Sequence, residues 1–122
     1  MVGDADLAST LDMNGRAPVP PVFATSRMIA LMEFAASQCI EPLLAEGELS
    51  VGVTVNVRHT AATPASVAVT ATARYLGMEG KLYRFEVVAS DPAGEIGRGL
   101  QERAIIDRAR LMAAAERRSA GR

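Results

Sequence analysis

Residues 28–40 are the most hydrophobic stretch of the chain, and they constrain the fold because a segment that is apolar on most sides has to be enclosed. Thr25 and Ser26 stand just before this stretch and predict a helix N-cap. The apolar pattern stops near Gly47, and Pro42 predicts an irregular last turn. We therefore expect one central helix that is buried on nearly all sides.

From residue 50 onward, apolar and polar residues alternate with a period of two, which is typical of β-strands. Short clusters of Pro, Gly, Ser and Asp interrupt the alternation and favour turns. We expect four strands at about 50–59, 67–75, 82–89 and 95–107, joined by turns at 63–66, 77–80 and 91–94. Three strand–turn–strand units in succession predict an antiparallel meander.

One apolar helix and four antiparallel strands can bury each other only if the sheet curves round the helix. The sequence therefore predicts an α+β hotdog fold, with one central apolar helix wrapped by a curved antiparallel sheet. A ferredoxin-like or cystatin-like α+β sheet is the alternative. The 122 residues suffice for one core, so we divide the chain into a lead-in at 1–20, a hotdog domain at 21–107 and a basic tail at 108–122.

The composition argues against several kinds of site and location. Cys39 and His59 are the only cysteine and the only histidine, so we expect no disulfide, no metal site and no cofactor. No apolar run reaches the ~18 residues of a membrane helix. The acidic N-terminus does not resemble a secretory signal. We therefore expect a cytoplasmic protein with no membrane partner.

The charge of the chain is uneven. Five arginines and one glutamate give residues 108–122 a net charge of +4, whereas the whole chain is at −1. A basic tail of this kind could contact nucleic acid or the phosphates of a nucleotide-like ligand. It contains no aromatic residue on which a base could stack. We therefore expect a solvated helix end and a disordered terminus, and no nucleic-acid partner.

Glu33 lies in the middle of the apolar stretch, where a carboxylate must be hydrogen-bonded, paired or neutralised. Thr25 stands at the predicted start of the same helix, and His59 at the predicted end of the first strand. Side chains of these kinds perform acid–base and nucleophilic chemistry when they converge. Glu33 could instead form a structural ion pair with Arg27 or Arg58. Thr25 could simply cap the helix, and His59 could be a structural histidine.

Four segments together resemble the fluoroacetyl-CoA thioesterase family of hotdog proteins. They are VFATSRMIALME at 22–33, SVGVTVNVRHT at 50–60, ATP at 62–64 and GRGLQER at 97–103. The resemblance covers about 22–107 and implies that Thr25, Glu33 and His59 act together to hydrolyse an acyl-CoA thioester. It also implies that Gly52 and Arg103 belong to the substrate site.

Two positions depart from the family pattern. The last strand carries Gln101 where relatives commonly have histidine, and Ala65-Ser66 follows the Thr-Pro turn where relatives often have glycine. Neither position belongs to the Thr, Glu and His set. Both bear on which acyl group the site accepts.

Thioester hydrolysis needs an activated oxygen nucleophile, a proton carrier and donors that hold the oxyanion of the tetrahedral intermediate. We hypothesise that His59 is the general base and that Glu33 orients it, as in hydrolytic triads. Thr25, at a helix start with free N–H groups, would either attack the thioester or position the attacking water. In a competing hypothesis, Glu33 activates the water directly.

The resemblance thus implies an acyl-CoA thioesterase that releases free acid and thiol from a thioester of CoA or of a carrier protein. Hotdog proteins generally place the site near a subunit interface, so a homodimer with sheets joined edge to edge is also implied. The alternative from another class is a non-catalytic module that binds or senses acyl-CoA. A hotdog dehydratase or hydratase is a second enzymatic alternative, but its order of residues does not resemble the threonine-first order found here.

Overall fold

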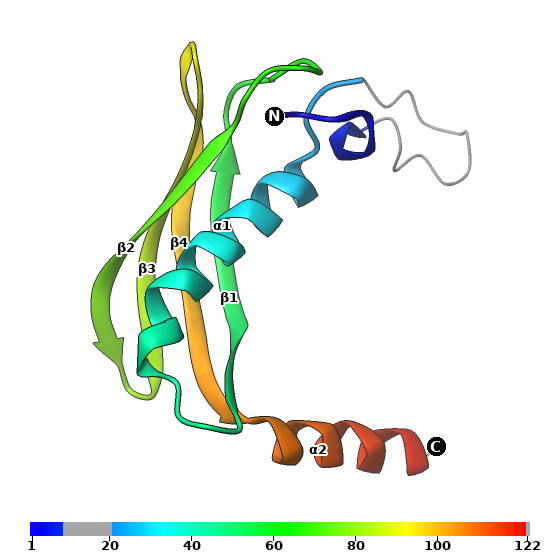
Figure 1. The fold of residues 1–122 in the computed structure, drawn as a ribbon, viewed down its shortest axis with the longest axis vertical. Helices are drawn as coiled ribbons and strands as arrows, with labels where there is room; N and C mark the ends of the chain where they lie inside the picture. Colours follow the sequence, from blue (N-terminus) through cyan, green and yellow to red (C-terminus); the bar gives the residue numbers. More distant parts are fainter. Residues whose placement is uncertain (9–20, 122) are drawn as a thin grey trace.

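The computed structural model describes residues 1–8 and 21–121, in which one helix lies on a curved antiparallel sheet (Figure 1). In chain order the elements are the 3-10 turn η1 (Asp4–Asp6), helix α1 (Thr25–Ile40), the 3-10 turn η3 (Glu41–Leu43), strands β1 (Glu48–His59), β2 (Thr70–Glu79), β3 (Leu82–Asp91) and β4 (Gly94–Asp107), and helix α2 (Arg108–Ala120). The α+β hotdog fold expected from the sequence is confirmed. Most of the predicted lead-in at 1–20 lies outside the described residues.

Helix α1 buries one stripe of side chains against the sheet. The stripe repeats every four residues and consists of Met28, Met32, Ala36 and Ile40, each 0% or 1% exposed. On the other side of the helix, Phe34 is 61% exposed. The prediction of a helix buried on nearly all sides is therefore wrong for one chain, because a single sheet covers only one side. The predicted irregular last turn is confirmed, since Pro42 lies in η3.

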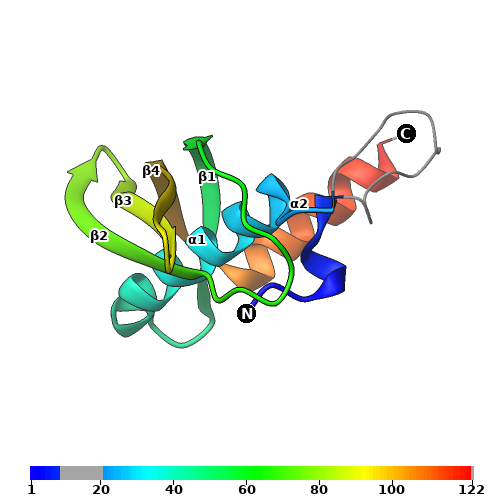
Figure 2. The same ribbon diagram turned by 90° about the horizontal axis from the view of Figure 1, so that it is seen from above.

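The sheet order is β1-β4-β3-β2, and every neighbouring pair is antiparallel. Strands β2, β3 and β4 form successive hairpins as predicted, but β1 pairs with β4 and not with β2. The predicted turn at 63–66 is therefore not a hairpin turn. The chain instead crosses one end of the sheet between β1 and β2 (Figure 2). Buried Thr63 anchors this crossing through a 2.8 Å hydrogen bond from its hydroxyl to Asp91 Oδ2.

A β-bulge in β1 decides which of its residues face α1. The register shifts between Gly52 and Thr54, which leaves Val53 as one extra residue in β1. In an uninterrupted strand, residues seven positions apart point to opposite faces of the sheet. Because of the bulge, Gly52 and His59 both face α1. The uniform alternation predicted for this strand is therefore wrong at one point.

Close packing fixes the first turns of α1 against the sheet. A Cβ built on Gly97 would lie 2.6 Å from Met28 Sδ and 2.6 Å from the carbonyl oxygen of Arg58, so only glycine fits there. Just before the helix, Phe23 N–H donates to the carbonyl oxygen of Thr63 at 2.8 Å. The start of α1 is thereby held at the end of the sheet where β1 terminates.

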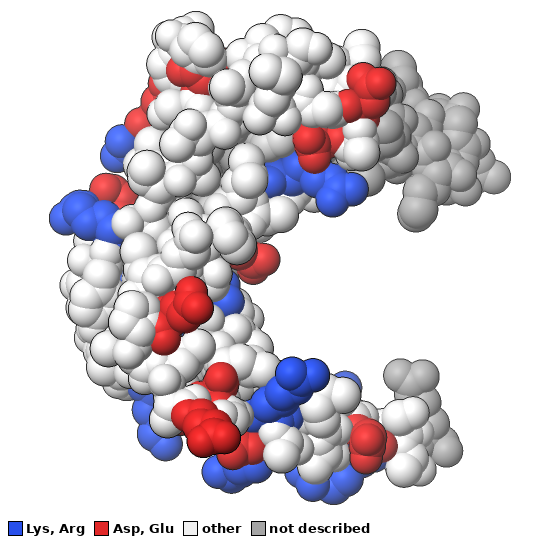
Figure 3. All heavy atoms as spheres, in the orientation of Figure 1, with Lys and Arg blue, Asp and Glu red and all other residues white. Residues whose placement is uncertain are grey.

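Helix α2 extends from the end of β4 and stands away from the sheet (Figure 1). Asp107 caps its first turn, because its side chain accepts a 3.0 Å hydrogen bond from Arg110 N–H. No residue of α2 is buried, and basic side chains gather on this arm of the molecule (Figure 3). The predicted disorder of the terminus is wrong as far as Ala120, which is helical. In the described parts of the chain, no helix is long and apolar enough to cross a membrane.

Candidate active site

Thr25 and His59 meet at one end of the sheet. Thr25 is the first residue of α1, and His59 is the last residue of β1. The hydroxyl Oγ1 of Thr25 lies 2.8 Å from Nδ1 of His59, in a hydrogen bond whose direction depends on the imidazole tautomer. The N-cap is Ala24, without a side-chain hydrogen bond. The predicted capping role of Thr25 is therefore wrong, and its hydroxyl is engaged by the histidine instead.

The imidazole of His59 is held on more than one side. The ring of Phe23 meets it edge-on, with 6.4 Å between centroids and an interplanar angle of 79°. Its second nitrogen, Nε2, is buried and has no hydrogen-bond partner in the described part of the chain. An imidazole fixed in this way, with a hydroxyl at Nδ1, can take up the hydroxyl proton.

An open pocket of about 340 Å³ lies at this hydrogen bond. Its lining is mostly small or apolar and consists of Ala8, Val22, Phe23, Thr25, His59, Thr60, Ala61 and Ala62. The backbone N–H groups of Thr25 and Ser26 have no acceptor among the described residues. Free amides at a helix start can stabilise a developing oxyanion. The pocket therefore lies beside a hydroxyl, an imidazole and a helix start with free amide N–H groups.

Glu33, Gly52 and Arg103 form a second cluster on the same face of the sheet. A Cβ built on Gly52 would lie 2.8 Å from Glu33 Oε1 and 3.7 Å from Arg103 Nη1. The carboxylate thus occupies space that the side chain of any other residue at this position would fill. Three of the five residues that the resemblance connects with catalysis or substrate binding are therefore neighbours here.

Arg103 is only 6% exposed and is held by neutral acceptors. Its Nε donates to Ser50 Oγ at 3.2 Å, and its Nη2 donates to the Ser50 carbonyl oxygen at 3.1 Å. Its Nη1 donates to Gln101 Oε1 at 3.2 Å. Burial lowers the pKa of Arg103, and the nearby Glu33 carboxylate acts in the opposite direction.

Sequence reasoning missed the part that Ser50 plays and treated Gln101 only as a departure from the family pattern. One signal could have linked Gln101 to Arg103, because residues two apart in a strand share a face. No comparable signal points to Ser50. Its contact with Arg103 depends on the pairing of β1 with β4, and this pairing was not predicted.

The two clusters do not meet within one chain. Glu33 follows Thr25 by eight residues, which is about 12 Å along a helix. Among the described residues, no hydrogen bond or ion pair joins Glu33 to His59, to Arg27 or to Arg58. The pairing of Glu33 with His59 is therefore not formed inside a single chain. The described residues also contain no group of three His, Cys, Asp or Glu side chains that could hold a metal ion.

Comparison with known families gives one match over most of the chain. The family model described as fluoroacetyl-CoA-specific thioesterase matches residues 2–109. A fluoroacetyl-CoA thioesterase from Streptantibioticus cattleyicolor is 46% identical over 90 residues, which make up 74% of this chain and 65% of that protein. The matched segment thus spans slightly less than two thirds of the length of this relative.

Solved structures of similar sequence share the fold. A mutant of the fluoroacetyl-CoA-specific thioesterase FlK, in complex with fluoroacetate and CoA, matches with a TM-score of 0.89 and 37% identity, over 96% of this chain and 93% of that chain. A thioesterase superfamily member from Thermus thermophilus matches with a TM-score of 0.88 and 31% identity, over 98% and 86% of the two chains. With the family model matching nearly the whole sequence, this chain belongs to the fluoroacetyl-CoA-specific thioesterase family.

Proposed function

We propose that this protein is an acyl-CoA thioesterase, which hydrolyses an acyl thioester to the free acid and the CoA thiol. The observation that carries the proposal is the 2.8 Å hydrogen bond between Thr25 Oγ1 and His59 Nδ1 at an open pocket. A hydroxyl bonded to an imidazole, beside free amide donors, is the arrangement that acyl transfer needs. Membership of a thioesterase family supports the same reaction.

In the proposed reaction, His59 Nδ1 takes the proton of the Thr25 hydroxyl while the hydroxyl oxygen attacks the thioester carbonyl carbon. The carbonyl oxygen becomes an oxyanion, which the amides of Thr25 and Ser26 stabilise. The C–S bond then breaks, the imidazolium gives its proton to the thiolate, and an ester of Thr25 remains. Water activated by the same imidazole hydrolyses this ester. In the alternative route, Thr25 positions a water molecule that attacks the thioester directly.

We further propose a homodimer in which Glu33 of one copy approaches His59 of the other copy. Strand β1 is an edge strand, and its Val53 is 55% exposed. A free edge of this kind pairs readily with another strand. Antiparallel pairing of two β1 strands about a two-fold axis would bring the His59 end of one strand toward the Glu48 end of the other. Glu33 lies beside Gly52, in the half of β1 that begins at Glu48. This geometry supports a site to which both copies contribute.

The proposed substrate is a short-chain acyl-CoA. Solved structures of FlK contain fluoroacetate with CoA, and acetyl-CoA. The small residues that line the pocket at Thr25 and His59 fit an acyl group of similar size. A thioester carried by an acyl-carrier protein differs only beyond the pantetheine arm, so the same panel of acyl groups should be offered in both forms.

The test is thiol release from short, medium and aryl acyl-CoAs, measured with Ellman's reagent. We expect turnover of at least one substrate and a loss of about 10²-fold or more in His59→Ala, which removes the general base. The matched control is Arg74→Ala, because Arg74 is 70% exposed on β2, at the other edge of the sheet. If a folded protein binds acyl-CoA but releases no thiol, the enzyme proposal is wrong and the non-catalytic binding module takes its place.

A further inference from the structure

We propose that Gln101 and Ser50 are positioning residues that hold the guanidinium of Arg103 away from the Glu33 carboxylate. Held in this way, Glu33 stays free of an ion pair and can accept a proton or orient a histidine. The inference rests on the proposed function, which assigns Glu33 to thioester hydrolysis. It adds two residues to the machinery around Glu33.

The guanidinium of Arg103 is restrained at all three of its nitrogens. Two of the acceptors belong to Ser50 on β1, and the third is the side-chain oxygen of Gln101 on β4. All three are neutral, and they come from two paired strands. A planar guanidinium with acceptors at each nitrogen cannot turn without giving up a hydrogen bond. The sheet, and not Glu33, therefore determines where this positive charge lies.

Glu33 is close enough to form an ion pair with Arg103 if either side chain moves. Its Oε1 and Arg103 Nη1 flank the same space beside Gly52, at 2.8 Å and 3.7 Å from the position of a Cβ there. Even so, no ion pair or hydrogen bond between them occurs within the described part of the chain. Neighbouring arginine and carboxylate groups ordinarily form short, often paired hydrogen bonds. Their separation here needs a cause, and the acceptors at Arg103 provide one.

The amide of Gln101 supports this assignment. Gln101 is 0% exposed, its Oε1 accepts from Arg103, and its Nε2 is buried with no partner among the described residues. Buried amides usually have partners for both their oxygen and their nitrogen. In Gln101 the bond to Arg103 is made although the amide nitrogen stays unpaired. The position of the Arg103 guanidinium thus depends on the carbonyl oxygen of Gln101 and not on its amide nitrogen.

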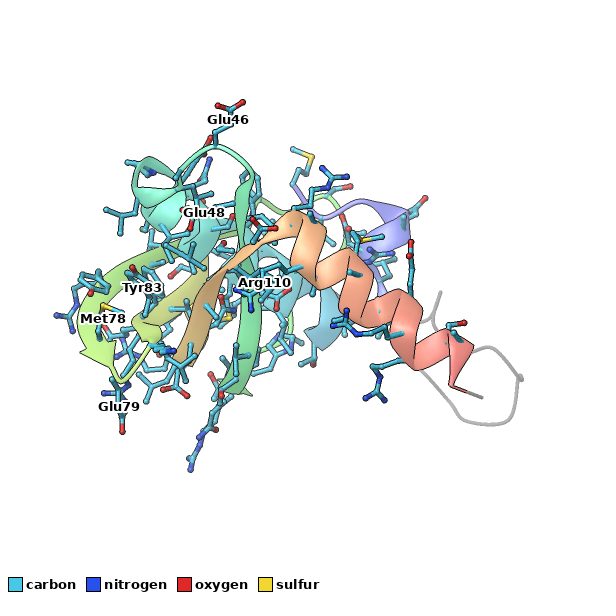
Figure 4. The ribbon with its side chains drawn as sticks, turned by 90° about the horizontal axis from the view of Figure 1, so that it is seen from below. Glu46, Glu48, Met78, Glu79, Tyr83 and Arg110 are labelled. Carbon is cyan, nitrogen blue, oxygen red and sulfur yellow. The ribbon has the colours of Figure 1, made fainter. Side chains whose placement is uncertain are left out.

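Arg103 is the cation beside Glu33, and the other ionisable groups near it are accounted for. On the α1 side of the sheet, the register places Arg103 and Asp107 on β4, Tyr83 and Asp91 on β3, Tyr75 on β2, and Glu48 and His59 at the two ends of β1, while Arg27 and Cys39 lie on α1 itself. Asp91 accepts a hydrogen bond from the Thr63 hydroxyl, and Asp107 accepts one from Arg110 N–H. Glu48 and Tyr83 lie near the end of the sheet that Figure 4 shows from below. Glu48 accepts from Ala45 N–H at 2.7 Å, and Tyr83 contacts Tyr75 with 6.2 Å between ring centroids.

The test compares Gln101→Leu with Gln101→Glu. Leucine has a similar volume but no acceptor, so Arg103 Nη1 is released to contact Glu33, and the ion pair keeps the carboxylate ionised to lower pH. Glutamate keeps an acceptor oxygen for Nη1 and should keep the guanidinium in place. For Gln101→Leu we expect kcat to fall by about 10²-fold with KM little changed, because a reacting group is misplaced. We expect Gln101→Glu to retain most of the wild-type kcat.

A titration of Glu33, which does not depend on catalysis, tests whether Gln101 holds Arg103 away from this carboxylate. In protein labelled with ¹³C at the glutamate carboxyl carbon, the Glu33 resonance can be assigned by its loss in Glu33→Gln. We expect its NMR titration midpoint to lie at lower pH in Gln101→Leu than in wild type. In Gln101→Glu we expect no such lowering, because the acceptor oxygen is kept and the added negative charge acts in the opposite direction. An unchanged midpoint in folded Gln101→Leu would overturn the positioning role.

Two further results distinguish a failure of this inference from a failure of the proposed function and from a variant that does not fold. A shifted midpoint in a protein that hydrolyses no thioester would support the restraint on Arg103 and contradict only the proposed function. If Gln101→Leu does not fold, as judged by circular dichroism, Ser50→Ala replaces it, because it removes a single hydroxyl acceptor from the same guanidinium. We expect Ser50→Ala to move the Glu33 midpoint in the same direction by a smaller amount, and no movement would overturn the inference.

Discussion

Gly52→Ala should disable the Glu33 cluster without unfolding the protein. The added methyl group would lie 2.8 Å from Glu33 Oε1, which is well inside van der Waals contact, and 3.7 Å from Arg103 Nη1, which is an ordinary contact. The atom that has to move is the end of a flexible glutamate side chain. We therefore expect the carboxylate to shift while β1 keeps its place in the sheet.

The expected change in stability is small because two effects oppose each other. Gly52 does not have a positive φ, so alanine suits its backbone, and the loss of freedom in the unfolded chain stabilises by about 0.4–1 kcal/mol. Pushing the Glu33 side chain off its rotamer costs about 0.5–1.5 kcal/mol. The free energy of unfolding should thus change by less than about 1 kcal/mol. The reaction is more sensitive, since a misplacement on the order of 1 Å costs about 10²-fold in rate.

The assay is thiol release beside a urea unfolding curve, with Gly47→Ala as the matched control. Gly47 has a φ of +81° and no atom within 4 Å of a Cβ built there, so alanine would strain the backbone without touching the site. We expect Gly47→Ala to lose about 1–2 kcal/mol of stability and to keep its activity. Gly52→Ala should show the reverse pattern. Wild-type activity in Gly52→Ala would refute the argument that Glu33 needs the space beside this glycine.

Three further predictions concern other parts of the chain. Thr25→Ser should keep most of the thiol release and Thr25→Ala should lose about 10²-fold or more; an acyl ester of Thr25 found by mass spectrometry after rapid quenching would assign it as the nucleophile, and its absence would favour the water route. Asp107→Ala removes the cap on Arg110 N–H and should lower the free energy of unfolding by about 0.5–2 kcal/mol in urea, without changing thiol release. The hydrogen bond from Arg98 lowers the pKa of Glu95, so this pair stabilises the fold above the ordinary carboxylate pKa and loses that effect as pH falls through the lowered value. Thermal melts of Glu95→Gln and wild type should therefore converge in acid, and a gap that persists there would contradict this account.

Local sequence patterns located the regular elements well and their connections less well. The start of α1 at Thr25 and the strands β3 and β4 lie within a residue or two of the predicted bounds. An apolar stretch after a cap signature and an alternation with a period of two are both patterns among neighbouring residues, so the sequence displays them directly. The end of α1 at Ile40 came earlier than expected, although Pro42 had indicated an irregular last turn. The pairing of β1 with β4 was missed, because the alternation within a strand does not indicate which other strand it pairs with.

For the candidate site as well, the sequence indicated some features and left others undecided. That Glu33 lies in an apolar helix, and that Thr25 and His59 stand at the ends of predicted elements, follows from the sequence alone. The resemblance added Gly52 and Arg103 as site residues, and their roles in the reaction remain proposals.

Only the tertiary structure decided which of these groups meet. An apolar stretch shows that a helix is buried, but not against which strands, and a one-residue bulge in β1 is enough to turn His59 toward α1. Contact between Thr25 and His59, and the two acceptors that Ser50 offers to Arg103, depend on residues far apart in the chain. Periodicity is a property of neighbouring residues, whereas strand register and side-chain contacts depend on how the whole sheet assembles.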